Sequence, residues 1–385
     1  MRWEGTCSLS RRAFLKYPLA ASALAMVPWK GSFEWNSSPE RSAMRQEVQV
    51  SAIAPAQEGW FMPSEQAPHK RCWMAWPTST EFWGGKSMAV LDEVREDIAR
   101  LAKTIARFEP VTMLVLPGQE ESATKICGTS VSLQPIAFDD TWFRDSGPVF
   151  LTNRKKQGVA GSVLNFNAWG KKQPYPNDRT IAQELLTFLK MSQFRAPFVA
   201  EGGALETDGD GTLLVVTPSI ANPNRNPGKS VGQLTEELCG WLGVQKVIWI
   251  PCEHPDKWTD GHVDGKARFV RPGEVLADLR HPEIGKFLSQ AIDAKGRKLK
   301  VTEVEPPSKV RTAMPDFCKC YLNFYFPNGA VVMPHFGDTK EDQQAQEIVA
   351  KAYPSRQVVP VDLDALASGG GLIHCVTQQE PLPLA

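Results

Sequence analysis

Four segments of the sequence combine ionisable side chains with glycines, a combination that lets the backbone come close to a bound molecule. They contain a cysteine, two histidines and several carboxylates, which together can supply a nucleophile, a proton donor and acceptor, and ligands for a cation. Each stands at the end of a predicted strand, in a different part of the chain. The segments are 140–148 (DTWFRDSGP), 201–203 (EGG), 259–264 (TDGHVD) and 369–375 (GGGLIHC).

Cys375 is the candidate nucleophile of this set. It follows three consecutive glycines, Gly369, Gly370 and Gly371, which can adopt positive φ and leave a thiol open to a substrate. His262 could then assist the chemistry of the thiol. The alternative for a single cysteine in a glycine-rich turn is a buried, inert thiol.

Acidic residues stand beside His262 and in two of the other segments. Asp264 lies two residues after His262 in a predicted strand, so the two side chains should share one face. Asp145 and Glu201 add two further carboxylates beside glycines. Because a planar guanidinium presents paired N–H donors that carboxylates bind in a bidentate manner, three acids in one pocket favour a guanidinium ligand. The alternatives are a surface ion pair between Arg144 and Asp145, a turn position for Glu201 and a structural histidine.

The sequence gives little indication of metal binding or nucleic-acid binding. It contains no HExxH motif and no paired CxxC motifs, so we expect neither a metal ion nor a cofactor. Cys318 and Cys320 with His374 form an alternative metal set, although their spacing is poor for zinc. Lys plus Arg and Asp plus Glu both number 43, so the basic footprint expected of a nucleic-acid-binding protein is missing.

The N-terminal segment 1–30 differs from the rest of the chain. A twin arginine at 11–12 precedes a short apolar stretch at 17–29, which is the pattern of a Tat export signal. That stretch is too short to span a bilayer, so we expect no membrane span in the mature protein. Residues 31–57 indicate a flexible linker, which leaves 58–385 as the catalytic domain. We expect export to the periplasm or cell surface, with a disordered N-terminal extension as the alternative.

From Trp60 onward, a strand or hairpin, an amphipathic helix and a closing strand recur five times. A unit of about 60 residues buries too little surface to fold alone, so the five should pack around a common axis with helices outside. The predicted fold is an α/β, five-unit pseudo-symmetric propeller that 369–385 completes and whose loops converge on a central pocket. The units are strand 72–76, helix 88–108 and strand 111–116; strands 149–151 and 161–167, helix 178–190 and strand 197–200; a hairpin turning at 208–211, strand 212–217, helix 229–242 and strand 245–250; strands 265–270 and 274–279, helix 282–295 and strand 299–304; and a hairpin turning at 327–329, helix 339–353 and strand 356–361.

In this order the four segments resemble the motifs of the agmatine deiminase and bacterial-type (Porphyromonas-type) peptidylarginine deiminase family, in the guanidine-modifying (pentein) superfamily. Family members read approximately W-x-R-D-x-G-P, E-G-G-N, G-H-x-D and G-G-G-N-x-H-C. The resemblance extends roughly from Trp60 to Ala385 and implies a five-unit α/β propeller around a pseudo-fivefold axis. The matching stretches are WFRDSGP at 142–148, EGGA at 201–204, GHVD at 261–264 and GGGLIHC at 369–375.

The resemblance implies a role for each candidate residue. Cys375 attacks the guanidinium carbon and forms a covalent thiouronium adduct, while His262 protonates the departing ammonia and then activates water. Asp264 and Asp145 hold the guanidinium nitrogens, with Glu201 as a third acid. The other substrate-binding positions shape the pocket around the thiol, Trp142 as a wall and Gly369, Gly370 and Gly371 as the turn.

Three positions depart from the family pattern. Ala204 and Leu372 each replace an asparagine, and Trp258 stands four residues before the histidine, where agmatine-specific members commonly carry an acid. The catalytic set is intact, while the groups that would recognise the rest of the substrate differ. The resemblance therefore supports deimination more firmly than it supports agmatine as the substrate.

The expected function is that of an agmatine deiminase-like hydrolase, which converts agmatine to N-carbamoylputrescine and ammonia. A peptidylarginine deiminase, which makes citrulline in peptides or proteins, is the first alternative. An amidinotransferase would need an amine acceptor that competes with water, and a non-catalytic guanidine-binding protein would show no turnover. The expected partner is a small guanidine or an arginine-containing peptide, and formation of a homo-oligomer stays open.

Overall fold

The computed structural model describes residues 53–384, with gaps at 84, 86, 313 and 315. The predicted export signal (1–30) and the predicted linker up to residue 52 lie outside the described residues. The 3-10 helix η2 (Pro55–Glu58) begins within the last residues of that predicted linker and contacts helix α7 (Val231–Leu242). No described helix is long and apolar enough to cross a membrane.

The described strands form five separate sheets, so the fold is mixed α/β. In the first four sheets an antiparallel strand pair is followed by a parallel pair; in the fifth, the isolated bridge between Tyr325 and Val332 takes the place of the antiparallel pair. The sheets are β15 (Gln378–Pro381), β1 (His69–Ala75), β2 (Val111–Val115) and β3 (Val131–Pro135); β4 (Val149–Asn153), β5 (Gly158–Val163) and β6 (Gln193–Arg195); β7 (Glu206–Thr207), β8 (Thr212–Val216) and β9 (Lys246–Ile250); β10 (Ala267–Arg271), β11 (Glu274–Asp278) and β12 (Lys300–Val304); and β13 (Ala330–Pro334) with β14 (Gln357–Val361).

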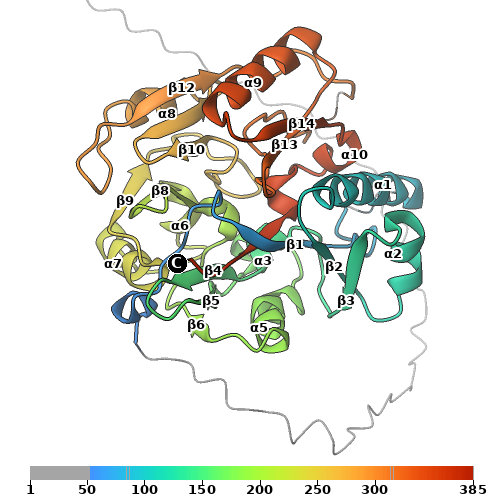
Figure 1. Cartoon of the computed structure of the whole chain (residues 1–385), viewed down its shortest axis with the longest axis horizontal. Coiled ribbons are helices and arrows are strands. Elements are labelled where there is room, and N and C mark those ends of the chain that lie inside the picture. Colours follow the sequence, from blue (N-terminus) through green and yellow to red (C-terminus); the bar gives the residue numbers. More distant parts are fainter. Residues whose placement is uncertain (1–52, 84, 86, 313, 315, 385) are drawn as a thin grey trace, which may run out of the picture. The chain divides into compact units, whose positions relative to one another are not determined.

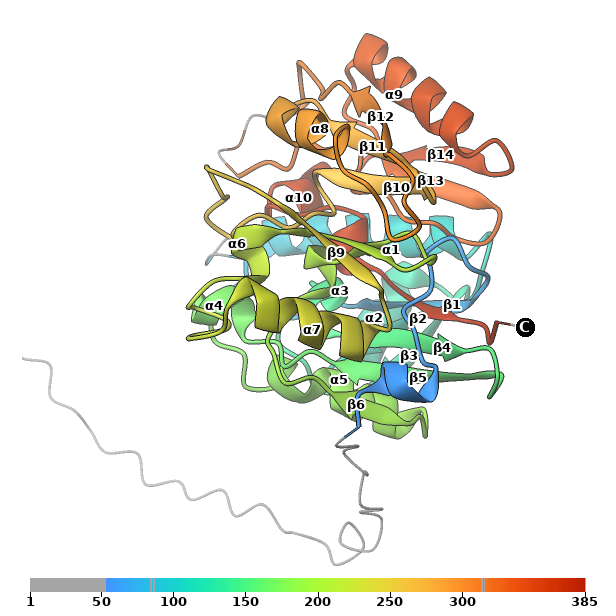
Figure 2. The same ribbon diagram turned by 90° about the vertical axis from the view of Figure 1, so that its left-hand side faces the viewer.

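Helices connect the parallel strands, because two parallel neighbours need a long crossover between them. The longer helices lie toward the outside of residues 53–384 and the strands toward the middle (Figures 1 and 2). Three of the short helical turns overlap three of the four candidate segments. The longer helices are α1 (Met88–Ile105), α2 (Glu120–Cys127), α5 (Asp178–Phe188), α7, α8 (Pro282–Leu288) and α9 (Thr339–Ala352); the short ones are α3 (Phe143–Ser146), α4 (Ala168–Lys171), α6 (Thr217–Ile220), α10 (Asp364–Ala367), η3 (Gly202–Ala204) and η4 (His374–Val376).

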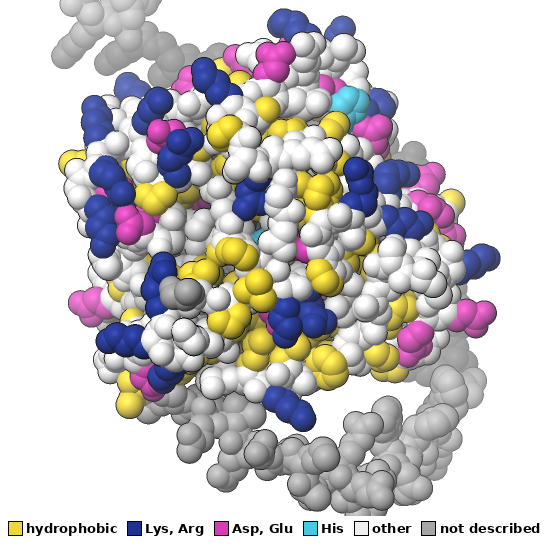
Figure 3. All heavy atoms as spheres, in the orientation of Figure 1, with side chains coloured by type: hydrophobic (Ala, Val, Ile, Leu, Met, Phe, Trp, Pro, Cys, Tyr) yellow, Lys and Arg dark blue, Asp and Glu magenta, His cyan; other side chains and the backbone are white. Residues whose placement is uncertain are grey.

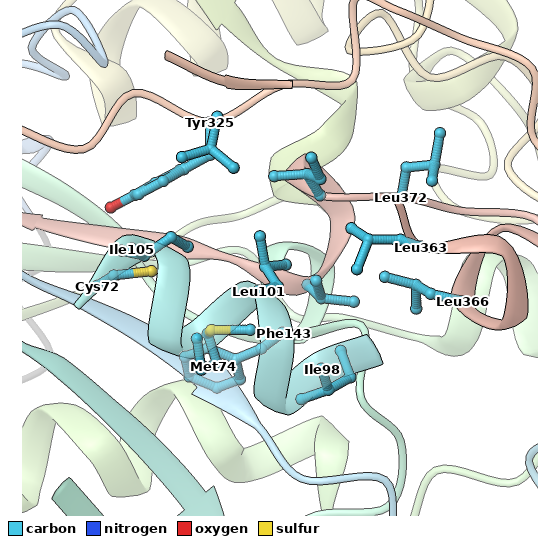
Figure 4. Packing of buried hydrophobic residues seen from close by; sticks show 14 of the residues in the cluster. Cys72, Met74, Ile98, Leu101, Ile105, Phe143, Tyr325, Leu363, Leu366 and Leu372 are labelled. Carbon is cyan, nitrogen blue, oxygen red and sulfur yellow. The ribbon is translucent and has the colours of Figure 1, made fainter. Parts of the chain in front are cut away.

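Helix α1 shows how the hydrophobic core holds the turn that leads to Cys375. Its apolar residues recur every three or four positions and form one buried stripe, which includes Ile98 and Leu101. This stripe packs in one cluster with Leu363, Leu366 and Leu372 from the C-terminal part of the chain (Figure 4). Full burial of one such side chain stabilises the fold by about 1.5–3 kcal/mol. Leu372 lies three residues before Cys375, so the core holds the turn that presents the thiol.

Most predicted elements are present with shifted ends, but the strand predicted at 197–200 is wrong. The third strand of that sheet is β6, at 193–195. The apolar residues that follow β6 are irregular, because the side chain of Asn226 accepts from the backbone N–H of Val199 (2.9 Å) and donates to its carbonyl (2.8 Å). A side chain thus satisfies backbone groups that a strand neighbour would otherwise satisfy.

Two further expectations for secondary structure need correction. Helix α8 ends at Leu288, although the pattern predicted helix to residue 295. Asp293 accepts from the backbone N–H groups of Lys295 and Arg297 (2.8 Å each) and turns the chain back, so the helix cannot continue. Helix α2 and strand β3, which follow the first unit, were not predicted.

Charged side chains are distributed without a dominant sign on the face shown in Figure 3, where basic, acidic and apolar groups are interspersed. This agrees with the equal numbers of basic and acidic residues in the sequence.

Candidate active site

A cavity of about 630 Å³ brings three of the four candidate segments together. Glu201, from the remaining segment, does not line it. The predicted site residues that line the cavity are Trp142, Asp145, His262, Asp264, Gly369, Gly370, Gly371 and Cys375. Because they come from helix α3, the turn η4 and loops that are far apart in the sequence, the cavity forms only when these parts of the fold come together.

Cys375 lies in the 3-10 turn η4 and is partly accessible from the cavity. The side-chain amide of Asn323 donates to its Sγ atom (3.3 Å), and the thiol donates to Oδ2 of Asp264 (3.6 Å). Burial raises the pKa of the Cys375 thiol well above its usual value, and the charges of Asp264 and Asp145 raise it further. In the unliganded protein the sulfur is therefore a neutral thiol at neutral pH.

Asp264 is held as a carboxylate beside this thiol. Its backbone N–H donates to the carbonyl of Gly203 (3.2 Å), and its Oδ2 atom lies 2.9 Å from Nδ1 of His374. Burial alone would raise the pKa of Asp264, but the hydrogen bond and charge of His374 outweigh burial and lower that pKa to about 2. A negative charge is therefore fixed on the cavity wall at every physiological pH.

Asp145 provides the second carboxylate on the wall, from helix α3. Its Oδ1 atom accepts from the backbone N–H of Gly203 and its Oδ2 atom accepts from Nε1 of Trp169, both at 2.9 Å. Burial raises the pKa of Asp145. The predicted alternative of a surface ion pair with Arg144 does not occur, because Arg144 is buried and pairs with Glu65 at 2.9 Å.

His262 stands between two carboxylates. Its Nε2 atom lies 3.3 Å from Oε2 of Glu201, and its Nδ1 atom lies 3.8 Å from Oδ1 of Asp145. Burial alone would lower the pKa of His262, but Asp145, Glu201 and Asp264 outweigh burial and raise that pKa to about 9. The imidazole is therefore a cation at neutral pH and can donate a proton.

The predicted strand under His262 and Asp264 is wrong, although both side chains reach the cavity. Residues 261–266 form a bend and a turn, in which the N–H groups of Lys266 and Ala267 donate to the carbonyl of Val263, and β10 begins only at Ala267. The two side chains meet at Gly203. A Cβ atom on that glycine would lie 2.6 Å from Nδ1 of His262 and 3.1 Å from Oδ2 of Asp264.

The predicted role of Glu201 as a direct ligand of the guanidinium also needs correction. Glu201 is fully buried, and both its oxygens accept from Nε of Arg225, at 2.8 and 2.9 Å. Arg225 in turn pairs with Asp260 at 2.6 Å. Glu201 is therefore paired with a buried arginine and contacts His262, and it does not line the cavity.

A buried network that the sequence did not predict supports the site from below. Glu65 accepts from Arg144 (2.9 Å) and Arg268 (2.6 Å), and its Oε1 atom lies 2.9 Å from Nε2 of His374. The positive charges of these partners outweigh burial and lower the pKa of Glu65 well below its usual value.

Four residues that support the site had no sequence signal, because each lies outside the four candidate segments. They are Glu65, Asn323, Arg225 and Trp169. His374 had one signal, its position directly before Cys375.

Aromatic rings form much of the cavity wall, and the glycines of the turn pack against them. A Cβ atom on Gly369 would lie 2.3 Å from Trp83, and one on Gly371 would lie 2.5 Å from Trp142. The two indole rings lie 5.6 Å apart, centre to centre. Gly370 has a φ of +92°, which favours glycine. Only glycines therefore allow the turn to pass this closely beneath the rings.

The three departures from the family pattern lie in different places. Ala204 and Leu372 are buried in the apolar core and do not line the cavity. Trp258 lines the cavity with 48% of its surface exposed, and its backbone carbonyl accepts from Nζ of Lys172 (2.7 Å). The first two departures change packing, and only Trp258 changes the surface that a substrate meets.

Within the described part of the chain, no group of three or more His, Cys, Asp or Glu residues could hold a metal ion. The alternative set of Cys318, Cys320 and His374 is not assembled. Both ring nitrogens of His374 are taken by Asp264 and Glu65, and the Cys320 thiol donates to the carbonyl of Gly265 (3.2 Å). All cysteines in the described residues are free thiols.

Comparisons with known proteins agree on one group of enzymes. Residues 61–381 match the family model described as Porphyromonas-type peptidyl-arginine deiminase. A relative from Legionella pneumophila (strain Paris) is 39% identical over 340 residues, 85% of this chain and 97% of its own. The agmatine deiminase of Pseudomonas aeruginosa (strain LESB58) is 35% identical over 366 residues, 86% of this chain and 97% of its own. The solved structure of the Enterococcus faecalis agmatine deiminase superposes with a TM-score of 0.80 at 30% identity, over 87% of this chain and 99% of that one.

Proposed function

Since the chain belongs to the Porphyromonas-type peptidyl-arginine deiminase family, we propose that it hydrolyses agmatine to N-carbamoylputrescine and ammonia. The enzyme is a hydrolase that acts on C–N bonds of amidines. The observation that carries the proposal is the convergence of a thiol, a cationic imidazole and two carboxylates on one aromatic cavity. The relatives named as agmatine deiminases supply the choice of substrate.

Asp145 and Asp264 bind the guanidinium of the substrate. They are fixed by the backbone of Gly203, by Trp169 and by His374, so they do not need to reorganise when the cation arrives. Carboxylates on two sides of a planar cation also restrict its rotation, which holds the central carbon for attack.

Cys375 is the nucleophile, and the substrate helps to ionise it. The two carboxylates oppose loss of the thiol proton in the empty site, whereas a bound guanidinium neutralises them and adds a positive charge beside the sulfur. The thiol proton passes to solvent, and the thiolate then adds to the guanidinium carbon. His262 gives its proton to the departing nitrogen, which leaves as ammonia, and a thiouronium adduct remains on Cys375.

Hydrolysis of the adduct reverses the role of the imidazole. Neutral His262 accepts a proton from water, and the resulting hydroxide adds to the carbon of the adduct. Collapse of that intermediate expels the thiolate of Cys375 and releases the ureido product. Glu201, paired with Arg225, keeps the ring in place through both steps.

Peptidylarginine deimination is the second candidate function. The matching family model is described by that activity, and the cavity is lined near Trp258 by polar side chains, among them Asp256, Lys257 and Asp316. A polar, half-exposed rim suits a substrate that continues out of the cavity as a peptide.

The arrangement of the five sheets supports a finer proposal for the fold, a five-unit α/β propeller. Each sheet belongs to a successive stretch of the chain, with a helix crossing between its parallel strands. The exception is β15, which leaves the end of the chain to pair with β1 in the first sheet, as expected for a closed array.

Export by the Tat route is a separate proposal, supported by the twin arginine at 11–12 and the apolar stretch at 17–29. It places the mature catalytic domain, 58–385, in the periplasm or at the cell surface. Replacing Arg11 and Arg12 by lysine and locating the protein by cell fractionation tests it. The variant should remain inside the cell, and unchanged export would remove the proposal.

The function is tested by incubating the purified full chain, with its thiol kept reduced, with agmatine or an arginine-containing peptide. Ammonia and ureido product are followed, with Cys375→Ser as the control. We expect turnover of agmatine that is lost in the variant. Product from the peptide alone would assign the second candidate, and no ammonia from either would refute deimination of these substrates.

A further inference from the structure

One wall of the catalytic cavity carries an ammonium group that forms no ion pair with any described residue. Lys266 lines the cavity with only 8% of its surface exposed, and its side chain makes no hydrogen bond or ion pair with any residue of the described part of the chain. Burying a charge without a partner is unfavourable, so buried charges in proteins are normally paired. The mechanism proposed above does not use this group.

The other cations around the cavity differ from Lys266 because each has its own carboxylate. Arg280 makes two hydrogen bonds to Asp278, at 2.8 and 3.0 Å. Lys257 pairs with Asp316 at 2.7 Å. These contacts leave Lys266 as the cation on this wall whose charge is available to a ligand.

The carboxylates of the cavity do not reach Lys266. Burial alone would raise the pKa of Asp256 on the rim, and the charge of Lys266 helps to lower it, but the oxygens of Asp256 are used within its own turn. They accept from the backbone N–H groups of Trp258 (3.0 Å) and Thr259 (2.7 Å) and from the hydroxyl of Thr259 (2.7 Å). No ion pair within 4 Å joins Asp256 or Asp264 to Lys266 in the described residues.

Lys266 also has a fixed position relative to the guanidinium-binding acids. It lies two residues after Asp264, in the turn that its own N–H closes by donating to the carbonyl of Val263 (2.8 Å). A cavity of about 630 Å³ is larger than a guanidinium group needs, so the chain and far end of a substrate also fit inside. One turn thus presents a carboxylate for the cationic end of a substrate and an ammonium for another part of it.

We propose that Lys266 binds a carboxylate at the far end of the substrate, and that the enzyme deiminates ω-guanidino carboxylates as a substrate class beside agmatine. This inference rests on the proposed deiminase function. The chemistry at Cys375 is unchanged: water adds across the guanidinium carbon, ammonia leaves, and an ω-ureido carboxylate is released. The carboxylate takes no part in bond making and serves only to position the chain.

A matched pair of substrates tests the proposal. Agmatine and 5-guanidinopentanoate carry the same guanidine on the same four-carbon chain and differ only in an ammonium or carboxylate end. We expect the full-length wild-type enzyme to turn over both. Lys266→Met, which keeps the length of the side chain and removes its charge, should lower kcat/KM for 5-guanidinopentanoate by about 10-fold or more, the scale of one charge-assisted hydrogen bond. It should leave agmatine unchanged or faster.

Lys266→Arg separates charge from structure. It keeps the positive charge, so it should retain most of the activity on 5-guanidinopentanoate. An equal loss on both substrates in Lys266→Met would show a structural role and overturn the proposal. Turnover of agmatine without any turnover of 5-guanidinopentanoate would overturn it as well.

Binding without chemistry separates this inference from the deiminase function. Calorimetry of 5-guanidinopentanoate with Cys375→Ser, and with Cys375→Ser combined with Lys266→Met, reports on the subsite even where neither substrate is turned over. Binding at least about 10-fold weaker in the double variant supports the carboxylate site. Equal binding by the two proteins overturns it, whether or not the proposed reaction occurs.

Discussion

Gly203→Ala should disable catalysis through a single methyl group. Gly203 lies beneath the catalytic side chains, and a Cβ atom there would stand 2.6 Å from Nδ1 of His262, 2.8 Å from Oδ1 of Asp145 and 3.1 Å from Oδ2 of Asp264. The φ of Gly203 is not in the left-handed region, so alanine is compatible with its backbone. The effect of the substitution therefore comes from contact with the three side chains.

The size of the effect follows from the shortest of these distances. An ordinary contact of a Cβ atom begins near 3.4 Å, so the separation from His262 must grow by about 0.8 Å. Misplacement of a catalytic group by about 1 Å costs on the order of 100-fold in rate, or about 2.7 kcal/mol of activation free energy. Because Asp145 and Asp264 must move too, KM should rise as kcat falls. Overpacking should lower the free energy of unfolding by about 1–3 kcal/mol.

The assay is steady-state ammonia release from agmatine, with a thermal unfolding curve for each protein. Gly265→Ala is the matched control. That glycine also lines the cavity, but a Cβ atom on it would stand 3.8 Å from Sγ of Cys320, the nearest atom outside the neighbouring residues. The control should stay within about 2-fold of wild type, since nothing has to move. A folded Gly203→Ala with activity close to that of Gly265→Ala would refute the assignment of the three side chains to one catalytic arrangement.

Three other outcomes are expected. Glu65→Gln removes the carboxylate shared by two buried arginines. It should lower the free energy of unfolding, measured by urea titration, by about 3–5 kcal/mol. A loss below about 1 kcal/mol would show that the fold does not need this network. The pKa of His262 is raised from 6.5 in the unfolded chain to about 9, so its ion pairs stabilise the fold fully below pH 6.5 and are lost as the pH rises through about 9. The Tm of wild type should therefore fall between pH 7 and 9.5 by more than the Tm of His262→Gln, and parallel pH profiles would contradict the assignment. Asn323→Ala removes the amide that donates to Sγ of Cys375 and should lower kcat/KM for agmatine by about 10-fold. Asn323→Ser is a shorter polar control. An unchanged kcat/KM would exclude a role for the amide.

The sequence predicted the parts of the site that lie in short, polar, glycine-containing segments. Cys375 and Asp145 were found because each lies in a segment that combines ionisable side chains with glycine at the end of a predicted strand. His262 and Asp264 were found for a reason that proved wrong, since they lie in a turn and not in a strand. Their convergence depends on Gly203, which the spacing of two residues does not reveal.

The rest of the site depends on partners that are distant in sequence. Glu65 binds Arg268 and His374 across 203 and 309 residues, and no local pattern connects them. Glu201 beside two glycines was compatible with a substrate ligand until the structure placed Arg225 against both of its oxygens. Local periodicity therefore predicts which segments are helices and strands, while pairing of buried charges becomes visible only in three dimensions.

The pairing of β1 with β15 has a consequence for the time course of folding. Nε1 of Trp73 donates to Glu380 across 307 residues, and Cys375 lies only three residues before β15. Contacts of such long sequence separation form late, because the intervening chain must first become ordered. We therefore expect a partly folded chain, in which several units have already packed together, to bury tryptophans before the thiol is in place. In refolding experiments the return of activity should lag behind the change in tryptophan fluorescence, and the length of that lag would measure how long the molecule exists as a folded but inactive protein.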